Sequence, residues 1–161
     1  MSELALVVPF EKLAPVVDDL RERTCDSKPS HGMPPHVTLL VPAPRDARAI
    51  SGVLAPFPVF DVAFARLDRF PGVLWLAPEP VEPFRRMIEA LVRRFPDHPP
   101  YGGAFAEIVP HLTVAQAGLD EAGETVQRQL PLRARAERAV LLEREQPDRW
   151  REAASFELGE T

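Results

Sequence analysis

The sequence has one cysteine, few lysines and no long hydrophobic run. The single Cys25 excludes an internal disulfide and is compatible with the reducing cytoplasm, where we expect the protein to act. No stretch approaches the roughly 18 consecutive apolar residues of a membrane-spanning helix, so we expect no membrane partner. The initial segment MSELALVVPF has an acidic residue where a signal peptide has basic ones, and we interpret it as a first strand.

A net positive charge is also absent. The 161 residues carry a formal net charge of −5 at pH 7, whereas sequence-independent binding to a nucleic-acid backbone requires a basic surface. Nearly all of the cations are arginines, and the lysines are Lys12 and Lys28. Because a guanidinium makes forked contacts with phosphate, the composition still permits a small phosphate site. A chain of this length fits one domain, or two small lobes that share a core.

The hydrophobic pattern predicts a mixture of strands and helices. Helices show apolar residues at a 3.6-residue period, and strands are short β-rich runs bounded by proline or glycine. The predicted strands are 4–8, 37–41, 59–70, 73–77, 112–115, 136–143 and 153–158, and the predicted helices are 10–23, 46–54, 81–95 and 118–130. This order indicates an α+β fold with helices packed on antiparallel sheets.

One tetrapeptide pattern occurs twice. The segments from His36 to Leu39 and from His111 to Val114 both read His-apolar-Thr-apolar. Each follows a proline and a Pro/Gly-rich loop, and each opens a predicted strand. Because side chains alternate faces along a strand, the histidine and threonine of each copy share one face, while Val37 and Leu112 point into the core. The motifs and the order of elements suggest an internal duplication with two matching half-sites.

Two such half-sites supply an acid, a base and two hydroxyl groups. The pKa of an unperturbed histidine lies near 6.5, so one ring can be neutral and the other protonated at the same pH. A neutral imidazole accepts a proton from an attacking water, and an imidazolium donates one to the departing oxygen. Each threonine hydroxyl can donate to a non-bridging phosphate oxygen. The pattern therefore favours phosphoryl chemistry without a metal ion.

A metal site is the weaker interpretation of the same residues. Zinc usually takes three or four protein ligands with short spacings, and the third would have to be Asp46 or Glu107. Two further residues are candidates for substrate binding. Arg45 follows the first motif and could reach phosphate, although a solvated surface role also fits. Tyr101 precedes the second motif and could stack on a base, although a turn aromatic fits equally well. Trp75 is interpreted as a core residue.

The segment from Gly32 to Leu40, together with Pro110 to Val114, resembles the 2H phosphoesterase superfamily. Within it, the chain is most similar to the bacterial 2′-5′ RNA ligase and cyclic phosphodiesterase group. The resemblance implies a single domain over residues 1–161, with two pseudo-twofold-related lobes of duplicated antiparallel sheets, flanking helices and a central cleft. It implies no cofactor and no obligate protein partner.

The resemblance also implies an activity, which is metal-independent hydrolysis of 2′,3′-cyclic phosphates on nucleotides or RNA ends. The reverse direction would be 2′-5′ RNA ligation. Carried over residue by residue, His36 and His111 become the acid/base pair, and Thr38 and Thr113 become the phosphate anchors. The orientation of the substrate decides which histidine is the base. The alternative is a non-catalytic module that holds a nucleotide or RNA end in the same cleft, and the intact histidine pair weighs against it.

Overall fold

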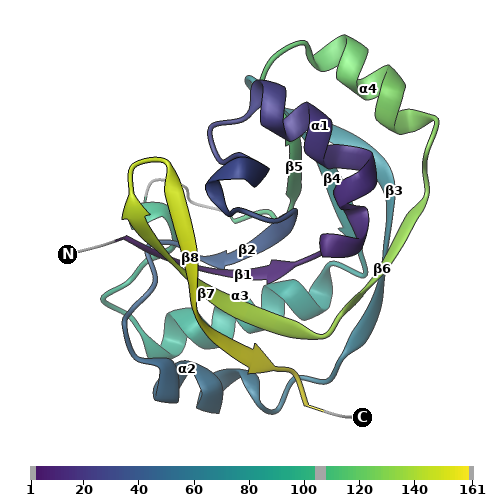
Figure 1. Ribbon diagram of the computed structural model, residues 1–161. Coiled ribbons are helices and arrows are strands. Elements are labelled where there is room, and N and C mark those ends of the chain that lie inside the picture. The colour runs from purple at the N-terminus through teal and green to yellow at the C-terminus, as the bar shows by residue number, and fades with distance from the viewer. Residues whose placement is uncertain (1–2, 104–107, 160–161) are drawn as a thin grey trace.

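The computed structural model describes residues 3–103 and 108–159 and shows two four-stranded antiparallel sheets with flanking helices (Figure 1). The strands are β1 (Leu4–Pro9), β2 (His36–Leu40), β3 (Phe60–Phe70), β4 (Val73–Glu79), β5 (Leu112–Ala115), β6 (Leu132–Ala136), β7 (Arg138–Gln146) and β8 (Arg149–Glu157). The helices are α1 (Ala14–Thr24), α2 (Ala47–Leu54), α3 (Glu82–Arg94) and α4 (Leu119–Gln127), with short 3-10 turns η1 (Glu11–Leu13), η2 (Pro29–His31) and η3 (Pro100–Gly103). The predicted α+β class is confirmed.

The two sheets have matching topologies. Their strand orders are β2-β1-β7-β8 and β5-β4-β3-β6. In each sheet a strand–helix–strand unit, β1-α1-β2 or β4-α3-β5, leaves the motif strand at the edge. The edge strands β2 and β5 contact each other. The predicted duplication thus corresponds to two lobes that meet along their motif strands.

The helices cross over between the two halves. Helix α1 packs against β5 of the second sheet, and α3 packs against β2 of the first. Helix α2 lies beside α3 and β8, while α4 lies beside α1, β3 and β4. In the view of Figure 1, α1 and α4 therefore cover the upper sheet, and α2 and α3 lie below the lower one. Each motif strand is backed by the helix that belongs to the other half of the sequence.

The main core fills the space between each sheet and its helices. Val37 and Leu112, the apolar residues between each histidine and threonine, are both 0% exposed within it, as predicted. Phe10 links the two halves, since its ring packs edge-to-face on Phe64 at 5.2 Å and on Phe84 at 6.4 Å. Each such buried ring contributes on the order of 2 kcal/mol of hydrophobic stabilisation.

A second apolar cluster covers the opposite face of the first sheet. Val7 pairs with Thr38 and shares its face, and it packs in this cluster with Met33 and Trp150. Gly32 has a φ of +89°, and a Cβ at this position would overlap the carbonyl oxygen of Trp150. Only glycine fits both the left-handed backbone and the close approach. The segment of Gly32 and Met33, which precedes His36, therefore packs closely against the first sheet.

Three differences from the predicted elements stand out. Strand β6 is absent from the prediction, although Leu132, Ala134 and Ala136 are buried and alternate with exposed arginines. Strand β8 begins at Arg149, four residues before the predicted 153, because it pairs with β7 up to a short turn. The first turn of the predicted helix 10–23 is the 3-10 turn η1.

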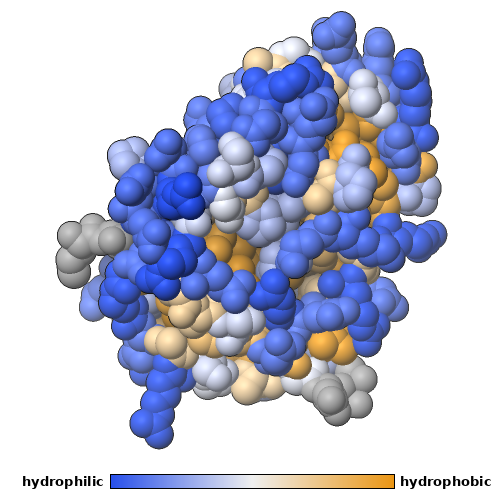
Figure 2. Space-filling view, viewed as in Figure 1, coloured by the Kyte–Doolittle hydropathy of each residue, from blue (hydrophilic) through white to orange (hydrophobic). Residues whose placement is uncertain are grey.

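The face seen in Figure 2 is mostly hydrophilic, with apolar residues in scattered patches. Ion pairs between arginines and carboxylates are frequent on β7 and β8, including Arg138–Glu152 and Arg151–Glu143. No helix in the described ranges is long and apolar enough to cross a membrane.

Candidate active site

The two half-sites lie on the facing edges of the two sheets. His36 is the first residue of β2, and His111 directly precedes β5. In each copy the threonine follows two residues later on the same face of the strand. A positive charge on His111 disfavours protonation of His36, so the two rings are close enough to interact. The structure thus brings the four motif residues to one place.

Both imidazoles are oriented by the same hydrogen bond. Nδ1 of His36 lies 2.8 Å from the carbonyl oxygen of Pro34, and Nδ1 of His111 lies 2.7 Å from that of Val109. A carbonyl oxygen can only accept, so Nδ1 must donate and carries the proton in the neutral ring. In both half-sites Nε2 is therefore the nitrogen that remains to accept or release a proton.

The surroundings keep both rings neutral. Burial lowers the pKa of His36 to about 4. The hydrogen bond to the Pro34 carbonyl opposes this shift, and the charges of Arg21 and His111 add to it. Burial likewise lowers the pKa of His111, opposed by its bond to Val109. Neutral rings at pH 7 are bases, and one must gain a proton to act as an acid.

An aromatic pair flanks the second half-site. The His111 ring packs edge-on against Phe70 at 5.0 Å and Trp75 at 5.8 Å, and the two aromatic rings are 4.8 Å apart. Trp75 pairs with Thr113 across β4 and β5. It is buried, as predicted, but it lies beside His111 rather than in either apolar cluster. Its Nε1 has no hydrogen-bond partner within the described ranges.

A cavity of about 680 Å³ opens beside this half-site. Its walls are largely apolar and include Phe70, Pro71, Val73, Tyr101, Ile108, Val109, His111, Thr113 and Gln116. Both the backbone and the side chain of Gln116 are hydrogen-bonded. Its N–H donates to Thr24 Oγ1 at 3.1 Å, and its Oε1 accepts from the Asp26 N–H at 2.6 Å. The end of α1 therefore supports one wall of the cavity.

Tyr101 binds one half-site and lines the cavity beside the other, whereas Arg45 lies apart from both. The Tyr101 hydroxyl is hydrogen-bonded with Thr38, and burial raises its pKa. The same residue lines the cavity beside His111, with a positive φ of 53° and its N–H donating to the carbonyl of Val41. Arg45 instead donates to Glu143 on β7 at 2.7 Å, with 55% of its side chain exposed. The structure does not bring Arg45 to the cavity.

The described residues contain no group of three or more His, Cys, Asp or Glu side chains placed to hold a metal ion. Of the two carboxylates considered as a third ligand, Asp46 caps α2 by accepting from the Ala49 N–H. Glu107 lies outside the described residues.

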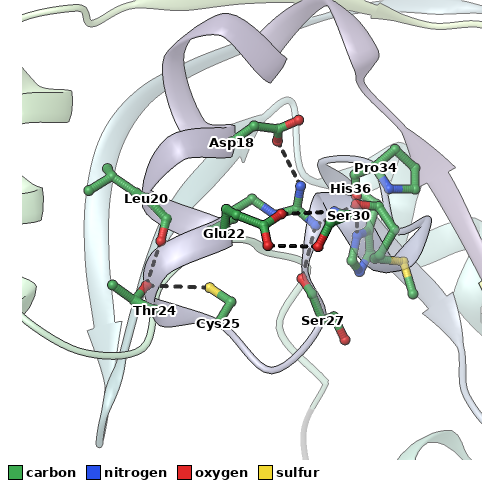
Figure 3. A network of polar contacts seen from close by, with 11 residues as sticks. Asp18, Leu20, Glu22, Thr24, Cys25, Ser27, Ser30, Pro34 and His36 are labelled. Atoms are coloured by element: carbon green, nitrogen blue, oxygen red, sulfur yellow. Dashed lines mark hydrogen bonds and ion pairs between the residues drawn. The ribbon is translucent and has the colours of Figure 1, made fainter. Parts of the chain in front are cut away.

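A buried arginine supports the first half-site. Figure 3 shows the polar network around it, with Asp18 on α1 on one side and Ser27, Pro34 and His36 on the other. Arg21 on α1 is 2% exposed and pairs with Asp18 at 2.7 Å. It also donates to the carbonyl oxygens of Met33 at 2.8 Å and Ser27 at 3.3 Å. Sequence reasoning missed it, although it extends the apolar stripe at the i+4 position from Val17.

A family model described as the 2′-5′ RNA ligase superfamily matches residues 9–148. No curated protein matches the chain.

Solved structures match over nearly the whole chain. A protein of Thermus thermophilus is 20% identical, with a TM-score of 0.65 and 100% of both chains covered. E. coli LigT complexed with 3′-AMP is 15% identical, with a TM-score of 0.59 and 98% of both chains covered. E. coli LigT complexed with ATP is 13% identical, with a TM-score of 0.62 over 99% of this chain and 100% of that one. At these identities the likeness shows the fold.

Proposed function

The chain belongs to the 2′-5′ RNA ligase superfamily of 2H phosphoesterases, and we propose that it is a metal-independent phosphodiesterase that hydrolyses 2′,3′-cyclic phosphates of nucleotides or RNA ends. One observation carries the proposal. The two half-sites hold their histidines by the same hydrogen bond and leave both Nε2 atoms for proton transfer. The cytoplasm remains our predicted location.

The proposed reaction uses each motif residue once. A neutral histidine accepts a proton from water at Nε2 while the water oxygen bonds to phosphorus. The bond from phosphorus to one ribose oxygen breaks, and the second histidine, protonated at Nε2, donates its proton to that oxygen. Hydroxyls of Thr38 and Thr113 donate to the non-bridging oxygens. The product is a phosphate monoester on one ribose hydroxyl, and an RNA hydroxyl in place of water would give the 2′-5′ ligase reaction.

We place the nucleoside in the cavity beside His111. Phe70 and Tyr101 give it aromatic walls, on which any base can stack. The volume of about 680 Å³ suits a ligand of nucleotide size. E. coli LigT, which shares the fold, was solved with 3′-AMP, ATP and NADP+, and this supports the same ligand class here.

The test is hydrolysis of the four nucleoside 2′,3′-cyclic monophosphates in the presence of EDTA. We expect turnover by the wild type and a loss of at least about 100-fold in His36→Asn and in His111→Asn. Arg45→Ala is the matched control and should keep its activity, because Arg45 pairs with Glu143 away from the cavity. Activity that survives in both histidine variants would overturn the site assignment, and loss on chelation would overturn metal independence.

One observation favours the non-catalytic alternative. Burial lowers the pKa of both histidines, so a protonated donor is scarce at pH 7. A bound cyclic phosphate adds a negative charge that raises the pKa of the ring facing it, and this restores the acid only in the complex. The enzyme therefore predicts faster turnover as the pH falls from 8 to 6. A binding module predicts tighter binding over the same range with no product.

A further inference from the structure

One polar side chain of the cavity beside His111 has no part in the proposed reaction. Gln116 lines this cavity together with His111, Thr113 and Tyr101, and the other described lining residues are apolar. Gln116 directly follows β5, three residues after Thr113, which places it up to about 10 Å farther along the chain. This span is comparable to that from the phosphate of a nucleotide to the far edge of its base. With the phosphate held at Thr113, Gln116 therefore lies where the base ends.

Gln116 is held in place before a ligand arrives. Its backbone N–H donates to Oγ1 of Thr24, and this hydroxyl donates in turn to the carbonyl oxygen of Leu20 at 2.8 Å (Figure 3). Its side-chain Oε1 accepts from the backbone N–H of Asp26 at 2.6 Å. Both anchors belong to the end of α1 and the residues that follow it. Because the side chain is already ordered, little conformational entropy is lost when it binds a ligand.

These bonds fix which end of the amide a ligand meets. A backbone N–H can only donate, so the atom of Gln116 that faces Asp26 must be the amide oxygen. Among the described residues the amide nitrogen Nε2 has no hydrogen-bond partner, and the residue is only half-buried. The nitrogen of a primary amide donates two hydrogens and accepts none. With its oxygen held at Asp26, Gln116 therefore offers a donor to a ligand in the cavity.

We propose that Gln116 is a specificity-determining residue that selects nucleotides whose base carries a carbonyl oxygen on its far edge. Uracil and guanine have this oxygen at the position where cytosine and adenine have an amino group. The carbonyl oxygen accepts from Nε2, whereas an amino group would set one donor against another. Stacking on Phe70 and Tyr101 accepts any base, so the selection falls to Gln116. This inference rests on the proposed function, which places the nucleoside in the cavity.

The first experiment measures kcat/KM for the four nucleoside 2′,3′-cyclic monophosphates and compares bases of equal size. The wild type should prefer the uridine to the cytidine nucleotide, and the guanosine to the adenosine nucleotide, by about 5- to 10-fold, the worth of one neutral hydrogen bond. The inosine nucleotide lacks the additional amino group of guanosine and should behave like the guanosine nucleotide. Equal values within both pairs would overturn the proposal.

Gln116→Glu is the matched variant. One carboxylate oxygen still accepts from the Asp26 N–H, while the other puts an acceptor in place of the amide nitrogen. The preference within each pair should therefore reverse, by about 5-fold or more, toward the cytidine and adenosine nucleotides. The added negative charge weakens the binding of all four anionic substrates alike, so it cancels within a pair.

Gln116→Met separates selection from a structural role. It keeps the length of the side chain but removes both polar groups, so both ratios should fall to about one. If Gln116 served only to hold Asp26, Gln116→Glu would keep the wild-type ratios and Gln116→Met would lower kcat/KM for all four substrates equally. Either of these results would overturn the proposal.

Binding of nucleoside 3′-monophosphates to the wild type separates this inference from the proposed function, because it requires no turnover and no variant that must fold. In a proton–nitrogen correlation spectrum, saturating 3′-UMP should shift the side-chain amide signal of Gln116 downfield, and saturating 3′-CMP should leave it nearly unchanged. If this signature appears but no cyclic phosphate is hydrolysed, the selection by Gln116 stands and the hydrolase fails. If cyclic phosphates are hydrolysed and the signal responds alike to both nucleotides, the hydrolase stands and the role of Gln116 fails.

Discussion

Replacing His36 should make the stability of the protein less sensitive to mild acid. The folded protein holds this ring neutral, with its pKa lowered to about 4, whereas an unfolded chain protonates it below about 6.5. Between these values the unfolded state binds the additional proton. Stability must therefore fall as the pH falls through this window, and it must be unaffected above it. His36→Asn removes the titrating group and keeps a donor for the carbonyl of Pro34.

The size of the effect follows from the gap between the two pKa values. The gap from about 6.5 to about 4 is worth at most about 3 kcal/mol at the acidic end. At pH 5 about 2 kcal/mol of it is expressed. The ring is only half-buried by surface area, and water that reaches it reduces this value, so we expect about 1 kcal/mol.

Urea denaturation at pH 7.5 and pH 5.0 measures this difference. The wild type should lose about 1 kcal/mol more stability than His36→Asn between the two pH values. The lowered pKa of His111 contributes equally to both proteins and cancels. Equal losses in the two proteins would show that His36 titrates normally in the folded state, and the reasoning about its burial would be wrong.

Three further outcomes follow from the structure. Thr38→Val and Thr113→Val should each lower kcat/KM by about 10- to 100-fold, because each removes a donor to a charged phosphate oxygen, while Thr→Ser at the same positions should retain most activity. Gly32→Ala should destabilise the fold by at least about 2 kcal/mol more than Gly72→Ala in urea denaturation. Both glycines have a positive φ, but only at Gly32 would the added Cβ meet the Trp150 carbonyl. Dialysis against EDTA should leave the melting temperature and the turnover rate of the wild type unchanged.

The fold can be predicted where local pattern and tertiary environment agree. The predicted strand 112–115 coincides with β5, because its apolar run is bounded by proline and is buried on one face. The apolar stripe of α3 is equally clear, since Phe84, Met87, Ile88 and Leu91 are all buried. Strand β6 escapes prediction because alanine and arginine have little β preference of their own, and its pairing with β3 holds it in place.

The sequence predicts only those site residues that belong to the repeated motif. The motif indicates which side chains share a face, and so it identifies both histidines and both threonines. Phe70 reaches His111 through the register of the β3–β4 hairpin, which a sequence pattern does not specify. Arg45 follows the first motif along the chain, but its side chain pairs with Glu143 on β7 and not with a residue of the cavity. Finding Arg21 requires the observation that the loop before β2 folds back onto the end of α1.

Because the packing of α1 and α3 is crossed, each half of the chain depends on the other to cover its motif strand. Neither half can cover its own motif strand, because α1 rests on β5 and α3 on β2. Strand β7, from near the end of the chain, completes the sheet that β1 begins. A polypeptide built from one repeat alone would expose its helix and its motif strand together. Each half thus supplies the helix that covers the motif strand of the other, as the subunits of a dimer with exchanged helices would.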